Sequence, residues 1–211
     1  MDNKQLTFYQ KYGKRIFDLF FAIIGLVLLW PIFLLIGILI KLDSPGSIVF
    51  KQKRVGKDGK IFTMYKFRTM VKDAEKLKEK YRHLNEADGP VFKIRNDPRF
   101  TKIGKLLSHT GLDESPQLYN ILRGEMDFVG PRPLPPQEDA KIPQDQQRIR
   151  RKAKPGLVSS WLANGAHNLT FKQWLEFDLK DIENKSLSYD IKIIFVSLCL
   201  LVQLILRGSD N

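Results

Sequence analysis

A long apolar run near the start of the sequence constrains the fold more than any other feature. From Ile16 to Ile40 the chain carries one charged residue, Asp18. A helix of about 20 apolar residues is long enough to cross a bilayer, so this segment is predicted to enter a membrane. A secretory signal peptide is the alternative, but the run is longer than the apolar part of such a peptide. No small-residue cleavage site follows before Lys41.

A proline near the middle of this run raises the question of whether the helix crosses the membrane or turns back. Pro31 removes a helix N–H, which favours a break at Trp30 and Pro31. Basic residues flank the run on both sides, namely Lys4, Lys11, Lys14 and Arg15 before it and Lys41, Lys51, Lys53 and Arg54 after it. Because positive charge prefers the cytoplasmic side, we favour a re-entrant helix-break-helix over a crossing helix. The re-entrant form requires partners for the backbone groups that the break releases within the lipid.

The chain as a whole is strongly basic. Its 211 residues include 35 Lys and Arg against 23 Asp and Glu, a formal net charge of +12. This balance implies an acidic partner, which is a nucleic acid, an anionic lipid headgroup or a phosphorylated small molecule. The sequence carries no motif of a nucleic-acid-binding fold, so we expect no nucleic-acid partner. The single cysteine, Cys199, lies in an apolar run and fits a reducing compartment.

The segments after the apolar run predict a mostly helical α+β fold with one small hairpin. Residues 47–54 and 61–67 read as strands, and Asp58 with Gly59 between them suits a tight turn. Residues 72–86 are highly charged, with apolar residues at helical spacing, and predict a solvated amphipathic helix.

Further helices are predicted from their capping residues. They follow Thr101, follow Ser115 and Pro116 as far as Gly124, and follow Thr170. The apolar stretch from Ile193 to Leu206 is short for a membrane crossing and contains Gln203. It therefore predicts a buried or interfacial helix.

Two adjacent acids, Asp113 and Glu114, stand just before one of these predicted helices. The helix dipole and the free N–H groups there favour negative charge, whether of a carboxylate or of a bound phosphate. A carboxylate can attack phosphorus, and a neighbouring carboxylate can hold a divalent metal. The pair therefore suits phosphoryl chemistry, although a helix cap or a surface feature presents the same residues.

The stretch that follows the acids adds a specific pattern. In GPRPLPP, proline on both sides of Arg132 holds the guanidinium out at low entropic cost. The segment LDESPQLYNILRGEMDFVGPRP resembles the signature of the bacterial sugar transferase family, monotopic phosphoglycosyl transferases that load a sugar phosphate onto polyprenyl phosphate. Other segments follow the order of that family, namely KRIFDLFFAIIG, YKFRTM, NDPRFTKIGKLL, KPG and FDLKDIENKSLSYDIKI. The resemblance covers nearly the whole chain from Lys14 onward.

The resemblance implies an architecture and a place in the cell. It implies a re-entrant membrane helix and amphipathic interfacial helices around an active site on the cytoplasmic face of the inner membrane. We accordingly divide the chain into a membrane segment, residues 1–45, and one integrated catalytic domain on the membrane surface, residues 46–211. Anionic membrane lipids are expected partners, and the oligomeric state stays open.

The resemblance also implies a reaction in two steps. Asp113 would attack the β-phosphate of a UDP-sugar and expel UMP, and polyprenyl (undecaprenyl) phosphate would then take the phosphosugar from Asp113. Glu114 and Asp113 would hold the Mg²⁺ that the family requires. No motif names the sugar or the glycan that is assembled.

Three basic residues are expected at the phosphates. Arg132 matches the arginine of the GPRP motif of the family and suits bidentate phosphate contact. Lys66 and Arg68 are two residues apart on a predicted strand, so we expect them on one face near the diphosphate. Binding of lipid headgroups is an equal alternative for these two residues.

The region after KPG departs from the family pattern. Where members carry an arginine near the nucleotide or sugar phosphate, this chain has Ala166. His167 is a candidate replacement, although a lone histidine is more often structural. With Trp161 and Asp178 it makes up the expected nucleotide and sugar region. The missing arginine motivates an alternative function, a catalytically silent membrane scaffold of a glycan-assembly pathway, while charge alone motivates a membrane-tethered nucleic-acid binder.

Overall fold

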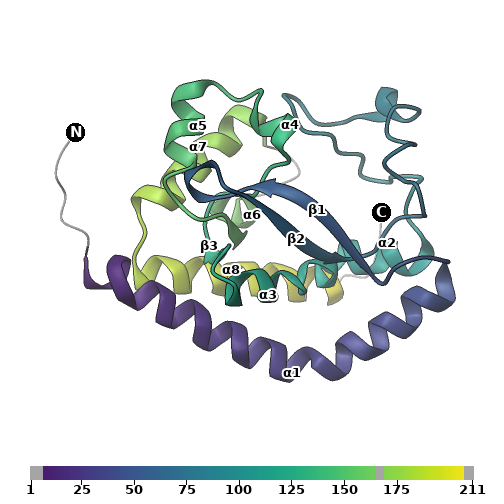
Figure 1. The fold of residues 1–211 in the computed structure, drawn as a ribbon, viewed down its shortest axis with the longest axis horizontal. Helices are drawn as coiled ribbons and strands as arrows, with labels where there is room; N and C mark the ends of the chain where they lie inside the picture. The colour runs from purple at the N-terminus through teal and green to yellow at the C-terminus, as the bar shows by residue number, and fades with distance from the viewer. Residues whose placement is uncertain (1–6, 165–168, 207–211) are drawn as a thin grey trace.

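The computed structural model describes residues 7–164 and 169–206 and shows a mostly helical chain with two small sheets (Figure 1). In chain order the elements are α1 (Lys14–Asp43), β1 (Val49–Val55), β2 (Ile61–Phe67), α2 (Lys102–His109), α3 (Gln117–Leu122), β3 (Asp127–Val129), α4 (Pro136–Asp139), α5 (Gln144–Arg150), β4 (Gly156–Val158), α6 (Ser160–Ala163), α7 (Phe171–Glu183) and α8 (Leu187–Leu206). The predicted fold class, mostly helical with a small antiparallel hairpin, is confirmed.

The apolar run forms one continuous helix, α1, which contains Pro31. Two separate helices were expected from the break at Trp30 and Pro31, and that expectation is wrong. A proline inside a helix costs about 3 kcal/mol through the missing bond and the ring clash, which a helix of 30 residues can absorb. Figure 1 shows instead a bend near the middle of α1, with both ends turned toward the rest of the molecule. Re-entry into the membrane remains a prediction.

One face of α1 packs on the protein and the rest is apolar and exposed. Ala22 is fully buried in a core with Met64, Leu118 and Ile121. The exposed side chains of α1 include Phe20, Leu28, Trp30, Leu34 and Leu35. Within the described residues, the helical stretch Tyr9–Asp43 is the one long and apolar enough to cross a membrane. Such a surface suits contact with lipid.

A buried charge network fixes the N-terminal end of α1. Lys14 Nζ lies 2.8 Å from Asp18 Oδ1 and 2.8 Å from Asp190 Oδ2 of α8. The hydroxyl of Tyr9 donates a hydrogen bond of 2.6 Å to the same Asp190 oxygen. Buried charges persist where an opposite charge and hydrogen bonds satisfy them, and both are present here. The network joins the first described helix to the last.

The predicted hairpin is confirmed as β1 and β2. The strands are antiparallel, with Val55 opposite Ile61 next to the turn. Asp58 and Gly59 occupy the turn with φ values of 57° and 74°, the left-handed region that such turns require. The second sheet, β3 and β4, is parallel and was not predicted, because strands of three residues are too short to display an alternating pattern.

The charged segment 72–86 does not form the predicted helix. It runs through turns, with Asp73 at a φ of 67° and one 3-10 turn at Arg82–Leu84. Isolated helices of this length are marginal in water, and most of their stability in proteins comes from packing an apolar face. With few apolar side chains to pack, this segment has no such source of stability.

The helices predicted from caps are confirmed as α2, α3 and α7. The side chain of Thr101 accepts a hydrogen bond from the Gly104 N–H, and Thr170 forms a capping box with Gln173. The terminal apolar stretch forms α8, as expected, and carries exposed side chains such as Phe195. Its position at a membrane interface stays a prediction.

Candidate active site

The acid pair lies in a 3-10 turn, Leu112–Glu114, that leads into α3. Gly111 begins this turn at a φ of 66°, a conformation that glycine adopts without steric cost. The Asp113 side chain is turned inward and the residue is 7% exposed, whereas Glu114 is half-buried. The turn thus removes both carboxylates from bulk water while leaving them next to each other.

Two cations reach the acids from other parts of the chain. Lys66, on β2, forms a short ion pair and hydrogen bond with Glu114 Oε1, and its Nζ lies 3.9 Å from Asp113 Oδ2. Arg132, in the loop after β3, places Nη2 at 3.7 Å from the same Glu114 oxygen. The structure therefore brings together four residues singled out in the sequence, from three separate segments.

Burial and the two cations give the acids different pKa values. Burial raises the pKa of Asp113 to about 6, even though Lys66 beside it favours the ionised form. Burial acts in the same direction on Glu114, but Lys66 and Arg132 outweigh it and lower the pKa of that carboxyl. Neighbouring acids whose pKa values are driven apart are frequent at catalytic sites.

The Asp113 carboxylate has fewer partners than that of Glu114. Among the described residues, no side chain donates a hydrogen bond to Asp113, and its ion-pair partner there, Lys66, is 3.9 Å away. A carboxylate oxygen that no side chain hydrogen-bonds is available to attack phosphorus or to bind a cation.

A magnesium site at the acid pair is compatible with these residues. The described ranges contain no group of three or more His, Cys, Asp or Glu that could hold a metal ion. Mg²⁺ differs from structural metals in that it is usually held by one or two carboxylates together with substrate phosphates. Asp113 and Glu114 supply those two carboxylates, so they fit a site that substrate phosphates would complete.

Arg68 is not brought to the acid pair. Its buried guanidinium donates hydrogen bonds to three carbonyls at the C-terminal end of α1, those of Ile40, Ser44 and Pro45. The expected alternation with Lys66 fails because β2 ends at Phe67, so Arg68 lies beyond the pleated part of the strand. The arginine fastens the end of the apolar helix to the hairpin.

The predicted nucleotide and sugar region lies next to Arg132. The guanidinium of Arg132 stands over the ring of Trp161, 5.6 Å from its centre. Asp178, on α7, is fully buried, and its Oδ1 accepts a hydrogen bond of 3.3 Å from the backbone N–H of Arg132. His167 and Ala166 lie outside the described residues.

Several residues that support the site were missed in the sequence. Arg54 Nη1 donates a hydrogen bond of 2.8 Å to the Pro133 carbonyl, and Arg150 Nη2 donates one of 2.7 Å to the Arg132 carbonyl. Asn120 bonds two backbone groups of β2 and so ties α3 to the hairpin. The one available clue is the proline-rich loop itself, whose carbonyls must find side-chain donors because few N–H groups lie nearby.

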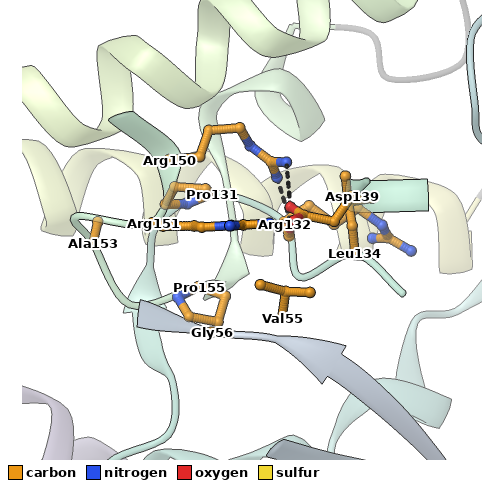
Figure 2. A pocket seen from close by; sticks show the side chains of 10 residues that line it. All are labelled: Val55, Gly56, Pro131, Arg132, Leu134, Asp139, Arg150, Arg151, Ala153 and Pro155. Carbon is orange, nitrogen blue, oxygen red and sulfur yellow. Dashed lines mark hydrogen bonds and ion pairs between the residues drawn. The ribbon is translucent and has the colours of Figure 1, made fainter. Parts of the chain in front are cut away.

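A small cavity lies behind Arg132. Figure 2 shows Arg132, Arg150 and Asp139 among the side chains that line it. Its volume of about 20 Å³ holds a water molecule but no sugar nucleotide. The cavity belongs to the support of the loop and is not a substrate pocket.

Known proteins resemble the chain over most of its length. Residues 9–203 match the family model described as bacterial sugar transferase. The galactosyl transferase CpsE of Streptococcus agalactiae is 41% identical over 187 residues, which cover 88% of this chain and 41% of that protein. The exopolysaccharide production protein ExoY of Rhizobium meliloti is 35% identical over 187 residues, which cover 87% of this chain and 82% of that protein.

A third relative has a name that states a reaction. The UDP-glucose:undecaprenyl-phosphate glucose-1-phosphate transferase of Escherichia coli is 37% identical over 191 residues, which cover 87% of this chain and 39% of that protein. The chain thus spans most of ExoY but less than half the length of the other two relatives.

Proposed function

The chain belongs to the bacterial sugar transferase family, and from this premise we propose that it moves a sugar 1-phosphate from a UDP-sugar to polyprenyl phosphate. The names of several relatives state such a transfer to undecaprenyl phosphate or a lipid carrier. The observation that carries the proposal is the acid pair, in which Asp113 keeps an oxygen without a hydrogen-bonding side chain while two cations hold Glu114.

In the first step the Asp113 carboxylate attacks the β-phosphorus of the UDP-sugar. A bond forms between a carboxylate oxygen and phosphorus as the bond to the UMP oxygen breaks, and UMP leaves with the electron pair. Lys66 and Arg132 lie where they would neutralise the phosphate oxygens once these displace Glu114. Mg²⁺, held by Glu114 and Asp113, would supply further neutralisation of the diphosphate.

In the second step the phosphate of the polyprenyl carrier attacks the same phosphorus and releases Asp113. The product is a polyprenyl diphosphosugar, and the number of phosphoanhydride bonds is unchanged. The apolar surface of α1 supports a site at the membrane, where such a carrier is found. We place the protein on the cytoplasmic face of the inner membrane, with its basic flanks against anionic lipids.

The test is UMP release from a panel of UDP-sugars with undecaprenyl phosphate. We expect release by the wild type to require Mg²⁺ and to be lost in Asp113→Asn, and we expect mass spectrometry of the wild type with donor alone to reveal a phosphosugar adduct. Asp145→Asn is the control, because Asp145 is an exposed acid of α5 outside the acid pair. Equal release by Asp113→Asn would remove Asp113 from the mechanism. Absence of release with every donor would favour the silent-scaffold alternative.

A further inference from the structure

One buried ion pair holds the backbone of Arg132 on both sides. The Arg132 N–H donates to Asp178 Oδ1 at 3.3 Å, and the Arg132 carbonyl accepts from Arg150 Nη2 at 2.7 Å. The pair itself is close, with Arg150 Nε 3.0 Å from Asp178 Oδ2. Asp178 is fully buried and Arg150 is 6% exposed, so both side chains lie behind the loop.

The sequence of the loop makes Arg132 dependent on these two side chains. Pro131 and Pro133 have no N–H, and the backbone bonds beside Arg132, from the Gly156 N–H to the Pro131 carbonyl and from the Val55 N–H to the Leu134 carbonyl, both 2.9 Å, do not involve the Arg132 N–H or carbonyl. A buried ion pair is costly unless further polar partners satisfy its atoms. Here the further hydrogen bonds go to the Arg132 peptide group, and Asp139 Oδ1 lies 3.9 Å from Arg150 Nη1. Both polar groups of the Arg132 peptide are therefore held by the side chains of this pair.

The guanidinium of Arg132 lies beside the acid pair. Its Nη2 lies 3.7 Å from Glu114 Oε1, and its side chain is 33% exposed, enough to meet a substrate phosphate. We propose that Asp178 and Arg150 are positioning residues that clamp the Arg132 peptide and thereby direct its guanidinium toward the reacting phosphate. This inference rests on the proposed function, and it assigns to Asp178 the support of Arg132 in place of direct contact with the nucleotide or sugar.

A double-mutant cycle separates the clamp from general stabilisation. Asp178→Asn removes the charge that pairs with Arg150, and we expect kcat/KM for the UDP-sugar to fall about 10- to 100-fold. In an Arg132→Ala background the same substitution is expected to cost less than about twofold, because no guanidinium remains to be directed. Equal losses in the two backgrounds would overturn the clamp.

A second buried aspartate of α7 provides the matched control. Asp181 accepts hydrogen bonds from the Ser160 N–H at 3.0 Å and the Tyr189 hydroxyl at 2.7 Å, and these bonds do not involve Arg132. After correction for the folded fraction, we expect Asp181→Asn to lower kcat/KM by the same factor with and without Arg132. A residue with a purely structural role thus lowers kcat/KM equally in the two backgrounds, whereas a positioning residue lowers it only when Arg132 is present.

Hydrogen exchange tests the clamp without turnover. Four of the residues from 130 to 136 are prolines, so only Gly130, Arg132 and Leu134 carry exchangeable amides. The Gly130 N–H is bonded to the Val158 carbonyl, 3.1 Å away, and serves as an internal reference.

The variant for this measurement replaces both charges at once, so that neither is left buried alone. We expect Arg150→Met with Asp178→Leu to speed exchange of the Arg132 amide about tenfold and to leave the Gly130 amide unchanged. Unchanged exchange at Arg132 would overturn the clamp. Accelerated exchange in a protein that never releases UMP would support the clamp as a structural device while removing the proposed function.

Discussion

Asp178 illustrates what a buried charge does to stability at one position. Burial raises the pKa of Asp178 to about 6, although Arg150 beside it favours the charged form. The folded protein therefore holds the Asp178 proton more tightly than the unfolded chain does. The stability that protonated Asp178 contributes is fully present below pH 3.8, the ordinary pKa of an aspartate. It is lost as the pH rises through about 6. At neutral pH Asp178 is therefore ionised, and it contributes less to the free energy of unfolding than it does in acid.

Asp178→Asn removes this titration. Between about pH 4 and pH 7, we expect the free energy of unfolding of the wild type, relative to the variant, to fall by up to about 3 kcal/mol. Urea unfolding of both proteins in detergent, over a series of pH values, measures this difference. Asp145→Asn, at an exposed position, should give a flat difference, and a flat difference for Asp178→Asn as well would contradict the assignment.

Single residues were predictable where a local pattern marked them. The acid pair stood out as adjacent carboxylates, and Arg132 stood out between two prolines. Arg54 and Arg150 carried no such mark, because each acts on a carbonyl that folding brings near it, 79 and 18 residues away in sequence. A side chain that donates to a carbonyl distant in sequence produces no periodic pattern from which it could be predicted.

At the scale of elements, an arginine links the apolar helix α1 to α3, the helix that follows the acid pair. Arg15 Nη1 donates to the Ile121 carbonyl at 2.6 Å, and Nη2 donates to the Leu122 carbonyl at 2.8 Å. These carbonyls lie in the last turn of α3, and the Ile121 carbonyl also accepts from the Gly124 N–H at 2.9 Å, so the guanidinium and the backbone beyond the helix cap it together. Since α3 follows the acid pair directly, α1 holds the far end of the element that positions the site.

Arg15→Met is expected to loosen this connection. Charge-assisted hydrogen bonds contribute about 1.5 to 3 kcal/mol, so we expect unfolding in detergent to become easier by that amount and UMP release to fall. Lys11→Met removes the same charge from an exposed position before α1 and should change stability by less than about 0.5 kcal/mol. Equal effects of the two substitutions would show that charge, and not capping, is responsible.

Elements were predictable when their signals were local. The hairpin turn and the caps at Thr101 and Thr170 each combine a residue type with a fixed spacing, and all three were confirmed. Residues 72–86 show the limit, because helical spacing without an apolar partner surface does not make a helix. The parallel pairing of β3 with β4 depends on folding and not on either short segment.

The whole molecule places a charged site above an apolar helix. Figure 1 shows α1 along one edge, with its two ends turned toward the other elements. Two arginines fasten those ends: Arg15 ties the N-terminal end of α1 to α3, and Arg68, next to β2, ties the C-terminal end of α1 to the hairpin. This shape is compatible with entry and exit of α1 through one leaflet.

Cysteine labelling distinguishes re-entry from crossing. In a Cys199→Ser background, single cysteines at the exposed positions of Lys11 and Ser47 report on the two flanks of α1. With an impermeant maleimide, we expect both Lys11→Cys and Ser47→Cys to react in inverted membrane vesicles and neither to react in right-side-out vesicles. Reaction of one flank in each preparation would establish a crossing helix.

The network of Tyr9, Lys14, Asp18 and Asp190 also has a consequence for biogenesis. Tyr9 and Asp190 are separated by 181 positions in the chain. At a synthesis rate of about 5 to 20 residues per second, roughly 10 to 35 seconds pass between the two residues. The apolar helix is therefore synthesised well before Asp190, its buried partner on α8, exists. If α1 enters the membrane as proposed, the helix would reach the bilayer before the rest of the chain folds, and the proposed active site would form at a membrane surface.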